Sequence, residues 1–240
     1  MKRTLLLAMV AACQASNGDD FSVEPGGPGG TGMRVDASLI DAFDPDALPV
    51  ISGRVCLVRD LRAPTAGCAG SGADNITVTL GSRTAVTSAD GSFSIMKPAG
   101  SNLVWRASRP GIIVTSVVPF GPDTTIPAIG VQDYLDLQGA NSVVIVAGQG
   151  SIVTRIERNN TAQPGVTAAV SPTAAFATKY DGTTALAWTE LATSTRGTVW
   201  LPGTELGTNT VTATPATGAP TTLNVLVEDQ SITYVTIDLP

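Results

Sequence analysis

From Val50 onward, apolar and polar residues alternate along short runs that are separated by turn-forming residues. Alternation with a period of two is typical of a strand that buries one face. Asp90-Gly91, just before the run at 92–96, is a strong hairpin signal and predicts pairing of that run with residues 84–87. The pattern predicts an all-β protein of the sandwich type, with strands at 51–58, 76–80, 92–96, 103–107 and 112–118.

The second half of the chain repeats this arrangement. Residues 197–203 correspond to 91–100, and residues 165–170 correspond to 75–80. The last strands are expected at 222–227 and 232–239. A period of about 100 residues is too long for a solenoid repeat and predicts two tandem sandwich domains. We expect them at 49–120 and 148–240, joined by a linker at 121–147 in which residues 131–137 could form a short helix.

The first thirteen residues have the order of a secretion signal. Lys2 and Arg3 precede the apolar stretch 4–12, which is too short to span the roughly 30 Å hydrocarbon layer of a membrane. The sequence Val-Ala-Ala-Cys at 10–13 resembles the lipobox of bacterial lipoproteins. That resemblance implies a signal peptide at 1–12, cleavage after Ala12 and a lipid anchor on Cys13. Gln14 after the cysteine favours an outer-membrane lipoprotein of the cell envelope, although an ordinary signal peptide with an incidental cysteine is the alternative.

Residues 13–48 are expected to form a flexible tether, because they are rich in glycine, proline and acidic residues and poor in apolar ones. Glycines 27, 29 and 32 match G-x-G-x-x-G. No strand is expected before them and no amphipathic helix after them, so the match does not predict a dinucleotide site. Asp41, Asp44 and Asp46 lack the spacing of a calcium loop and are expected to be solvated.

Residues 50–118 resemble the carboxypeptidase regulatory-like domain. The motifs that carry the resemblance are Gly-Arg-Val at 53–55, Asn-Ile-Thr-Val-Thr-Leu at 75–80 and Thr-Ser-Ala-Asp-Gly-Ser-Phe-Ser-Ile at 87–95. Residues 148–240 resemble the same family more loosely, because Arg196-Gly197 stands in place of the Asp-Gly turn. The resemblance implies two Ig-like or transthyretin-like β-sandwiches with a structural or binding role. The zinc peptidase domain that accompanies this family needs histidine ligands.

The chain contains no histidine. This excludes Ser-His-Asp and Cys-His catalysis and His-ligated zinc, and it leaves carboxylate or lysine chemistry open. Ser94 and Lys97 match S-x-x-K, but residues three apart on a strand face opposite sides. We therefore expect no catalytic residue, no cofactor and no metal site. Removing Lys2 and Arg3 from the 14 basic residues leaves 12 against 20 acidic ones, so no basic patch for nucleic acid is expected.

Cys56 and Cys68 are the two cysteines outside the signal segment. In an oxidising envelope compartment we expect a disulfide between them, with two buried thiols as the alternative. Two thiols without histidine make a poor zinc site.

The sequence predicts a non-enzymatic, lipid-anchored envelope protein with a structural or protein-binding role, whose partner is an unknown envelope protein or glycan. One alternative is a polysaccharide- or peptidoglycan-binding module, in which Trp105, Trp188 and Trp200 would form a stacking face. The other is a hydrolase that works with carboxylates alone.

Overall fold

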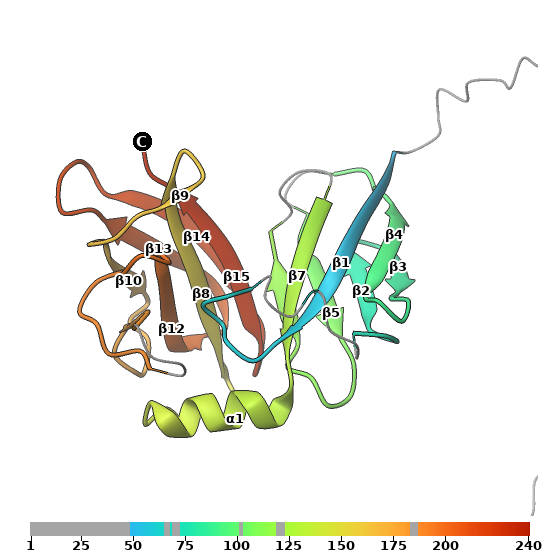
Figure 1. Cartoon of the computed structure of the whole chain (residues 1–240), viewed down its shortest axis with the longest axis horizontal. Helices are drawn as coiled ribbons and strands as arrows, with labels where there is room; N and C mark the ends of the chain where they lie inside the picture. The colour runs from blue at the N-terminus through green and yellow to red at the C-terminus, as the bar shows by residue number, and fades with distance from the viewer. Residues whose placement is uncertain (1–48, 65–67, 69–72, 101–102, 119–122, 183–186) are drawn as a thin grey trace, which may run out of the picture. The chain divides into compact units, whose positions relative to one another are not determined.

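The structure, a computed structural model, describes residues 49–64, 68, 73–100, 103–118, 123–182 and 187–240 (Figure 1). Within these residues nearly all regular structure is β, with one helix, α1 (Val131–Ala140). The strands are β1 (Val50–Val58), β2 (Thr77–Leu80), β3 (Arg83–Val86), β4 (Ser92–Met96), β5 (Trp105–Ser108), β6 (Thr115–Val117), β7 (Asp123–Ile129), β8 (Gln149–Arg158), β9 (Thr161–Ala162), β10 (Thr167–Ser171), β11 (Lys179–Tyr180), β12 (Thr198–Glu205), β13 (Gly207–Thr214), β14 (Thr221–Val227) and β15 (Ile232–Asp238). The predicted mostly-β fold is confirmed.

These strands form one long sheet and two short ones. The long sheet has the order β11-β12-β8-β15-β6-β5-β2-β3, with β9 paired to β8. We call β4-β1-β7 the first cover sheet and β10-β13-β14 the second cover sheet. Each cover sheet packs on one half of the long sheet, which gives two sandwiches built from strands of the first and of the second half of the chain.

The first sandwich buries alternate residues of β2, β4 and β5, whereas β1 and β7 also bury consecutive residues. Phe93 of β4 meets Trp105 of β5 edge to face, with ring centroids 5.2 Å apart. Around this pair lie the largest apolar side chains of the first core, which include Val55, Ile76, Val78, Leu80, Ile95 and Ile126. The alternation read from the sequence is therefore the alternation of core and surface positions.

The hairpin predicted at Asp90-Gly91 is wrong. β3 pairs with β2 in the long sheet, whereas β4 pairs with β1 in the first cover sheet. The Asp-Gly turn carries the chain from one sheet to the other, and the Asp90 carboxylate accepts hydrogen bonds from Ser88 Oγ and from the Ser92 amide. Gly91 is required here because its φ is 85° and an added Cβ would collide with the Val55 carbonyl.

The segment expected as a linker contains a strand as well as the helix. β7 pairs in parallel with β1, and Pro127 lies opposite Cys56. Proline lacks the amide that a central strand needs for pairing on both sides, but β7 is an edge strand and can spare that amide. Helix α1 begins at Val131 as expected and continues to Ala140.

The two sandwiches are joined through the C-terminal strand. β15 pairs in parallel with β8 of its own half and also with β6 of the first half. Paired residues lie on the same face of a sheet, so Val117 and Tyr234 share one face while Ser116 and Thr233 share the other. The first cover sheet lies on the Val117 face and the second on the Thr233 face, because Val235 belongs to the second core. The sequence-based expectation of two tandem sandwiches did not include this continuous sheet.

Candidate functional site

The opposite placement of the cover sheets leaves two hollows where the sandwiches meet. One lies beside β7, above the uncovered face of β8 and β15, and we call it the β7 pocket. The other lies beside β14, above the uncovered face of β2, β5 and β6, and we call it the β14 groove. Both hollows are lined by residues from both halves of the chain.

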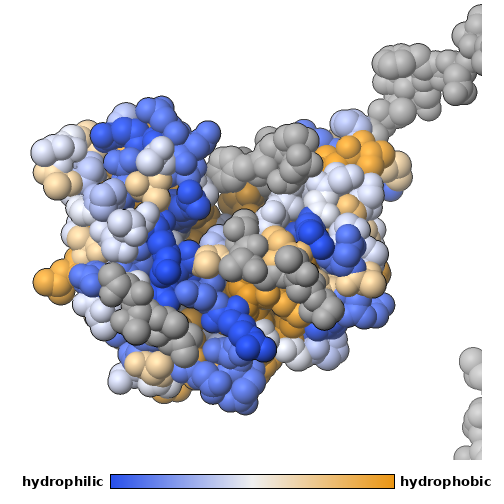
Figure 2. Space-filling model, in the orientation of Figure 1, coloured by the Kyte–Doolittle hydropathy of each residue, from blue (hydrophilic) through white to orange (hydrophobic). Residues whose placement is uncertain are grey.

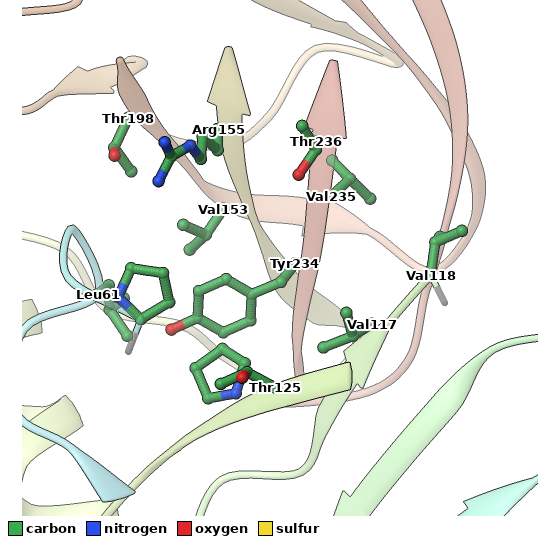
Figure 3. Close-up of a pocket in the computed structure, with 12 residues that line it drawn as sticks. Leu61, Val117, Val118, Thr125, Val153, Arg155, Thr198, Tyr234, Val235 and Thr236 are labelled. Carbon is green, nitrogen blue, oxygen red and sulfur yellow. The ribbon is translucent and has the colours of Figure 1, made fainter. Parts of the chain in front are cut away.

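The β7 pocket is small, with a volume of about 120 Å³. In Figure 3, Val153 and Tyr234 project between Arg155 and Thr198 on one side and Val117 and Val118 on the other. Arg155 donates its Nε–H to Glu157 Oε2 at 2.9 Å. Below the pocket, an apolar core closes the junction. It consists of Cys56, Val58, Leu61, Ile129, Tyr134, Leu137, Val143, Val153, Trp188, Trp200, Ile232 and Tyr234.

Arg62 fastens the loop after β1 to the second sandwich. Its guanidinium is fully buried and forms a bidentate ion pair with Asp60, in which Nε donates to Oδ1 at 2.7 Å and Nη2 donates to Oδ2 at 2.8 Å. Its Nη1 donates to the carbonyls of Gly182 and Ala187, at 3.0 and 2.7 Å, and its charge lies 5.7 Å from the ring centre of Trp188. One side chain therefore ties together segments about 120 residues apart in the sequence.

Asp60 stays ionised in this arrangement. Partial burial raises the pKa of the Asp60 carboxyl, but the hydrogen bonds and positive charge of Arg62 outweigh this effect and the pKa is lowered overall. The second-half loop that receives Arg62 is held by Asp181, whose buried carboxylate accepts the amide of Ser194 at 2.8 Å.

A buried polar network holds helix α1 in the same core. Ser151 Oγ lies 2.7 Å from the hydroxyl of Tyr134 and accepts the indole N–H of Trp200 at 3.1 Å. Burial raises the pKa of Tyr134 to about 12. Burial also raises the pKa of Tyr234 well above its usual value, so both phenols are neutral over the physiological range. These groups rigidify the junction and offer no acid or base near pH 7.

The β14 groove is the larger of the two hollows, with a volume of about 780 Å³. Its floor is the uncovered face of the first sandwich, where Arg106 donates its Nε–H to Glu228 Oε2 at 2.9 Å. This half-exposed ion pair links β5 to the turn after β14. One wall is β14, the last strand of the second cover sheet. The lining residues are Thr79, Gly81, Leu103, Val104, Arg106, Ser116, Val118, Thr208, Leu223, Asn224, Val225, Leu226, Glu228 and Thr233.

On the face shown in Figure 2, hydrophilic and hydrophobic residues are interspersed, and the main hydrophobic areas lie near its centre and at its upper right edge. No described helix is long and apolar enough to cross a membrane. Across the described ranges, no group of three or more carboxylate and thiol side chains is placed to hold a metal ion.

The residues singled out from the sequence have different outcomes. Cys56 and Cys68 form the predicted disulfide. Cys13 and the acidic residues 41, 44 and 46 lie outside the described residues. The three tryptophans are at most 4% exposed, so the stacking face expected for a glycan-binding module is not formed by them.

Sequence reasoning missed the residues that shape the hollows. Ser94 lies on β4 and Lys97 follows the end of that strand, so the S-x-x-K match does not lie at the start of a helix. The contacts of Arg62 with the second half of the chain and the pair Arg106–Glu228 gave no signal, because they join residues about 120 positions apart. The one available signal for the groove was the composition of β14, which carries no charge and no proline.

Comparison with known proteins gives no family. No protein-family model matches the chain, and no curated protein matches it significantly. Two interface mutants of the type II cohesin–X-dockerin complex from Acetivibrio cellulolyticus are similar at 16% and 14% identity, each with a TM-score of 0.25, over 38% of this chain and 72% of theirs. The Bacillus anthracis TIE protein is similar at 11% identity and a TM-score of 0.26, over 80% of this chain and 34% of that one. This level of similarity assigns no family, so the resemblance to regulatory-like domains stays a prediction.

Proposed function

We propose that this chain is a lipid-anchored protein of the cell envelope whose joined sandwiches have a protein-binding or structural role and catalyse no reaction. The lipobox-like segment ending at Cys13 supports the anchor. The disulfide between Cys56 and Cys68 supports an oxidising compartment, because disulfides persist outside the reducing cytosol.

The observation that carries the binding role is the β14 groove. It is built from both halves of the chain, and its floor and wall are held in place by the continuous sheet and by the Arg106–Glu228 ion pair. A preorganised groove loses little entropy when a partner enters it. The buried tryptophans give the glycan alternative no support.

Metabolic labelling tests the anchor. Cells that express the full chain are fed a palmitate analogue, and the protein is then captured and detected. We expect label on the wild type and none on the Cys13→Ala variant, with the wild type in the membrane fraction. An unlabelled wild type would overturn the anchor.

Site-specific crosslinking tests the binding role. A photo-reactive amino acid is placed at Thr79 in the groove, and in a matched control at Thr167, an exposed residue of the distant edge strand β10. After irradiation of intact cells, mass spectrometry should identify the same protein partner repeatedly from position 79 and not from position 167. Equal yields at both positions, or no protein adduct at position 79, would contradict the proposal.

A further inference from the structure

We propose that the β14 groove binds an extended peptide segment of a partner protein, which adds to the second cover sheet as a further strand beside β14. This inference rests on the protein-binding role proposed above and specifies how the partner is held. It is carried by the direction of the backbone groups of β14, by the absence of blocking residues on this edge and by the room in the groove.

The outer edge of β14 has backbone groups available for pairing. The carbonyl of Leu226 points away from β13, because it accepts a hydrogen bond from Thr233 Oγ1 of β15 at 2.9 Å. In an antiparallel strand the N–H and C=O of one residue point to the same side, and the side alternates from residue to residue. The N–H and C=O groups of Asn224 and Thr222 therefore also point away from β13, toward the groove.

No residue of β14 blocks this edge. Natural edge strands are protected from pairing by prolines, charges or shortness. Among the described edge strands, β7 contains Pro127, β3 begins with Arg83 and β11 has only two residues. The edge strands β4 and β10 have five residues each and are followed by prolines at 98 and 172. β14 is the longest edge strand of the second cover sheet, with seven residues, TTLNVLV, and neither charge nor proline within it; Pro220 and Glu228 flank its two ends.

The groove has the room for one strand. Strand spacing of about 4.8 Å, sheet spacing of about 10 Å and a rise of about 3.4 Å give roughly 160 Å³ per residue of a packed strand. The groove of about 780 Å³ therefore accommodates about five residues. An added strand would lie over β6 and β5 and would extend the second cover sheet across the junction.

A second copy of this chain does not fit the groove. Antiparallel pairing of two β14 strands needs a twofold axis perpendicular to the second cover sheet. Such an axis keeps the long sheet of the copy on the same side as the long sheet of the first molecule. The copy would then collide with β6, β5 and β2, which form the floor. A single strand with no sheet behind it avoids this collision.

The lining specifies the peptide. Side chains of the added strand that point inward meet the apolar groups of Leu103 and Val118 and also the Arg106–Glu228 pair, which is electrically neutral as a unit. Burying an unpaired charge there would be costly. The partner segment is therefore an extended stretch of about five residues, without proline, in which every second side chain is uncharged and mainly apolar.

The test uses the full-length protein and a phage library of random nine-residue peptides. Peptides that bind are synthesised, and amide exchange of the protein is followed by NMR with and without peptide. Strand addition slows exchange at Thr222 and Asn224 and leaves Leu223 and Val225, which face β13, unchanged. Methylating alternate peptide amides that face β14 should weaken binding by about tenfold or more, while methylating the other set should not.

A matched pair of variants separates the two edges of the second cover sheet. Asn224→Pro removes an amide on the groove side of β14 and should weaken binding about tenfold or more. Val170→Pro changes the opposite edge strand, β10. The Ala168 amide points away from β13, so the Val170 amide two residues on does so too, and this variant should leave binding unchanged. The N-methyl peptides give the same information without any change to the protein, in case a variant fails to fold.

Each outcome decides the inference. No selected peptide, equal binding by both methylated sets, or dimerisation through β14 would overturn it. If crosslinking at Thr79 recovers a partner while no peptide protects Thr222 and Asn224, the binding role stands and strand addition is wrong. If peptides add to β14 while cells yield no partner, the proposed role fails although the edge is competent.

Discussion

Replacing Arg62 should strongly weaken the junction between the two sandwiches. The variant Arg62→Met keeps much of the side-chain volume and removes the charge. It removes one buried donor from each of the carbonyls of Gly182 and Ala187, and it removes the main counter-ion of Asp60. Breaking a buried pair by removing one partner costs about 3–5 kcal/mol. Because the Asp60 side chain is 29% exposed and can be rehydrated, we expect the lower end, about 3 kcal/mol.

The assay is urea unfolding of the full chain, followed by intrinsic fluorescence, since Trp188 and Trp200 lie in the junction core. Arg155→Met is the matched control, because the Arg155 side chain is 47% exposed in its ion pair with Glu157, whose own side chain is 15% exposed. The control should lose no more than about 1 kcal/mol. A loss below about 1 kcal/mol for Arg62→Met, or equal losses for both variants, would refute the view that Arg62 fastens the sandwiches.

Three further predictions follow from the same contacts. The pKa of Asp60 is lower in the folded than in the unfolded protein, so its ionised form contributes stability above the unfolded pKa, and this stability is lost as the pH falls through the folded pKa. Thermal unfolding followed between pH 7 and pH 3 should therefore show a midpoint that falls in acid. The midpoint of Asp60→Asn should fall less steeply. Reducing the Cys56–Cys68 disulfide should cost about 3 kcal/mol in urea unfolding with and without reductant, since it opens a loop of twelve residues; an unchanged midpoint would contradict this. Ser151→Ala should cost about 2 kcal/mol, because it removes the buried hydroxyl that pairs with the Tyr134 hydroxyl and accepts the indole N–H of Trp200; a near-neutral result in the same assay would contradict this.

Local pattern was sufficient to locate most strands but not to pair them. Period-two alternation marked the positions of β1, β2 and β4, and the burial of side chains follows it in β2 and β4. The turn at Asp90-Gly91 has good hairpin chemistry, yet its two flanking strands lie in different sheets. Turn chemistry sets the local path of the chain, whereas long-range packing selects the partner of each strand.

The candidate site shows the same division. The disulfide was predictable because two cysteines and the inferred compartment leave few options. The β14 groove was not, because its floor and its wall come from different halves of the chain. Arg106 and Glu228 are separated by 122 residues and have no sequence signature as a pair.

The sequence by itself determined the β class, the two-fold repetition and the cysteine pair, since each depends on local periodicity or on composition. Only the tertiary structure decided that β15 joins β8 to β6 and that the two cover sheets lie on opposite faces. The physical reason is that strand order arises from hydrogen bonds and apolar contacts between distant segments, for which one sequence read alone carries no register. That order creates the open edge of β14.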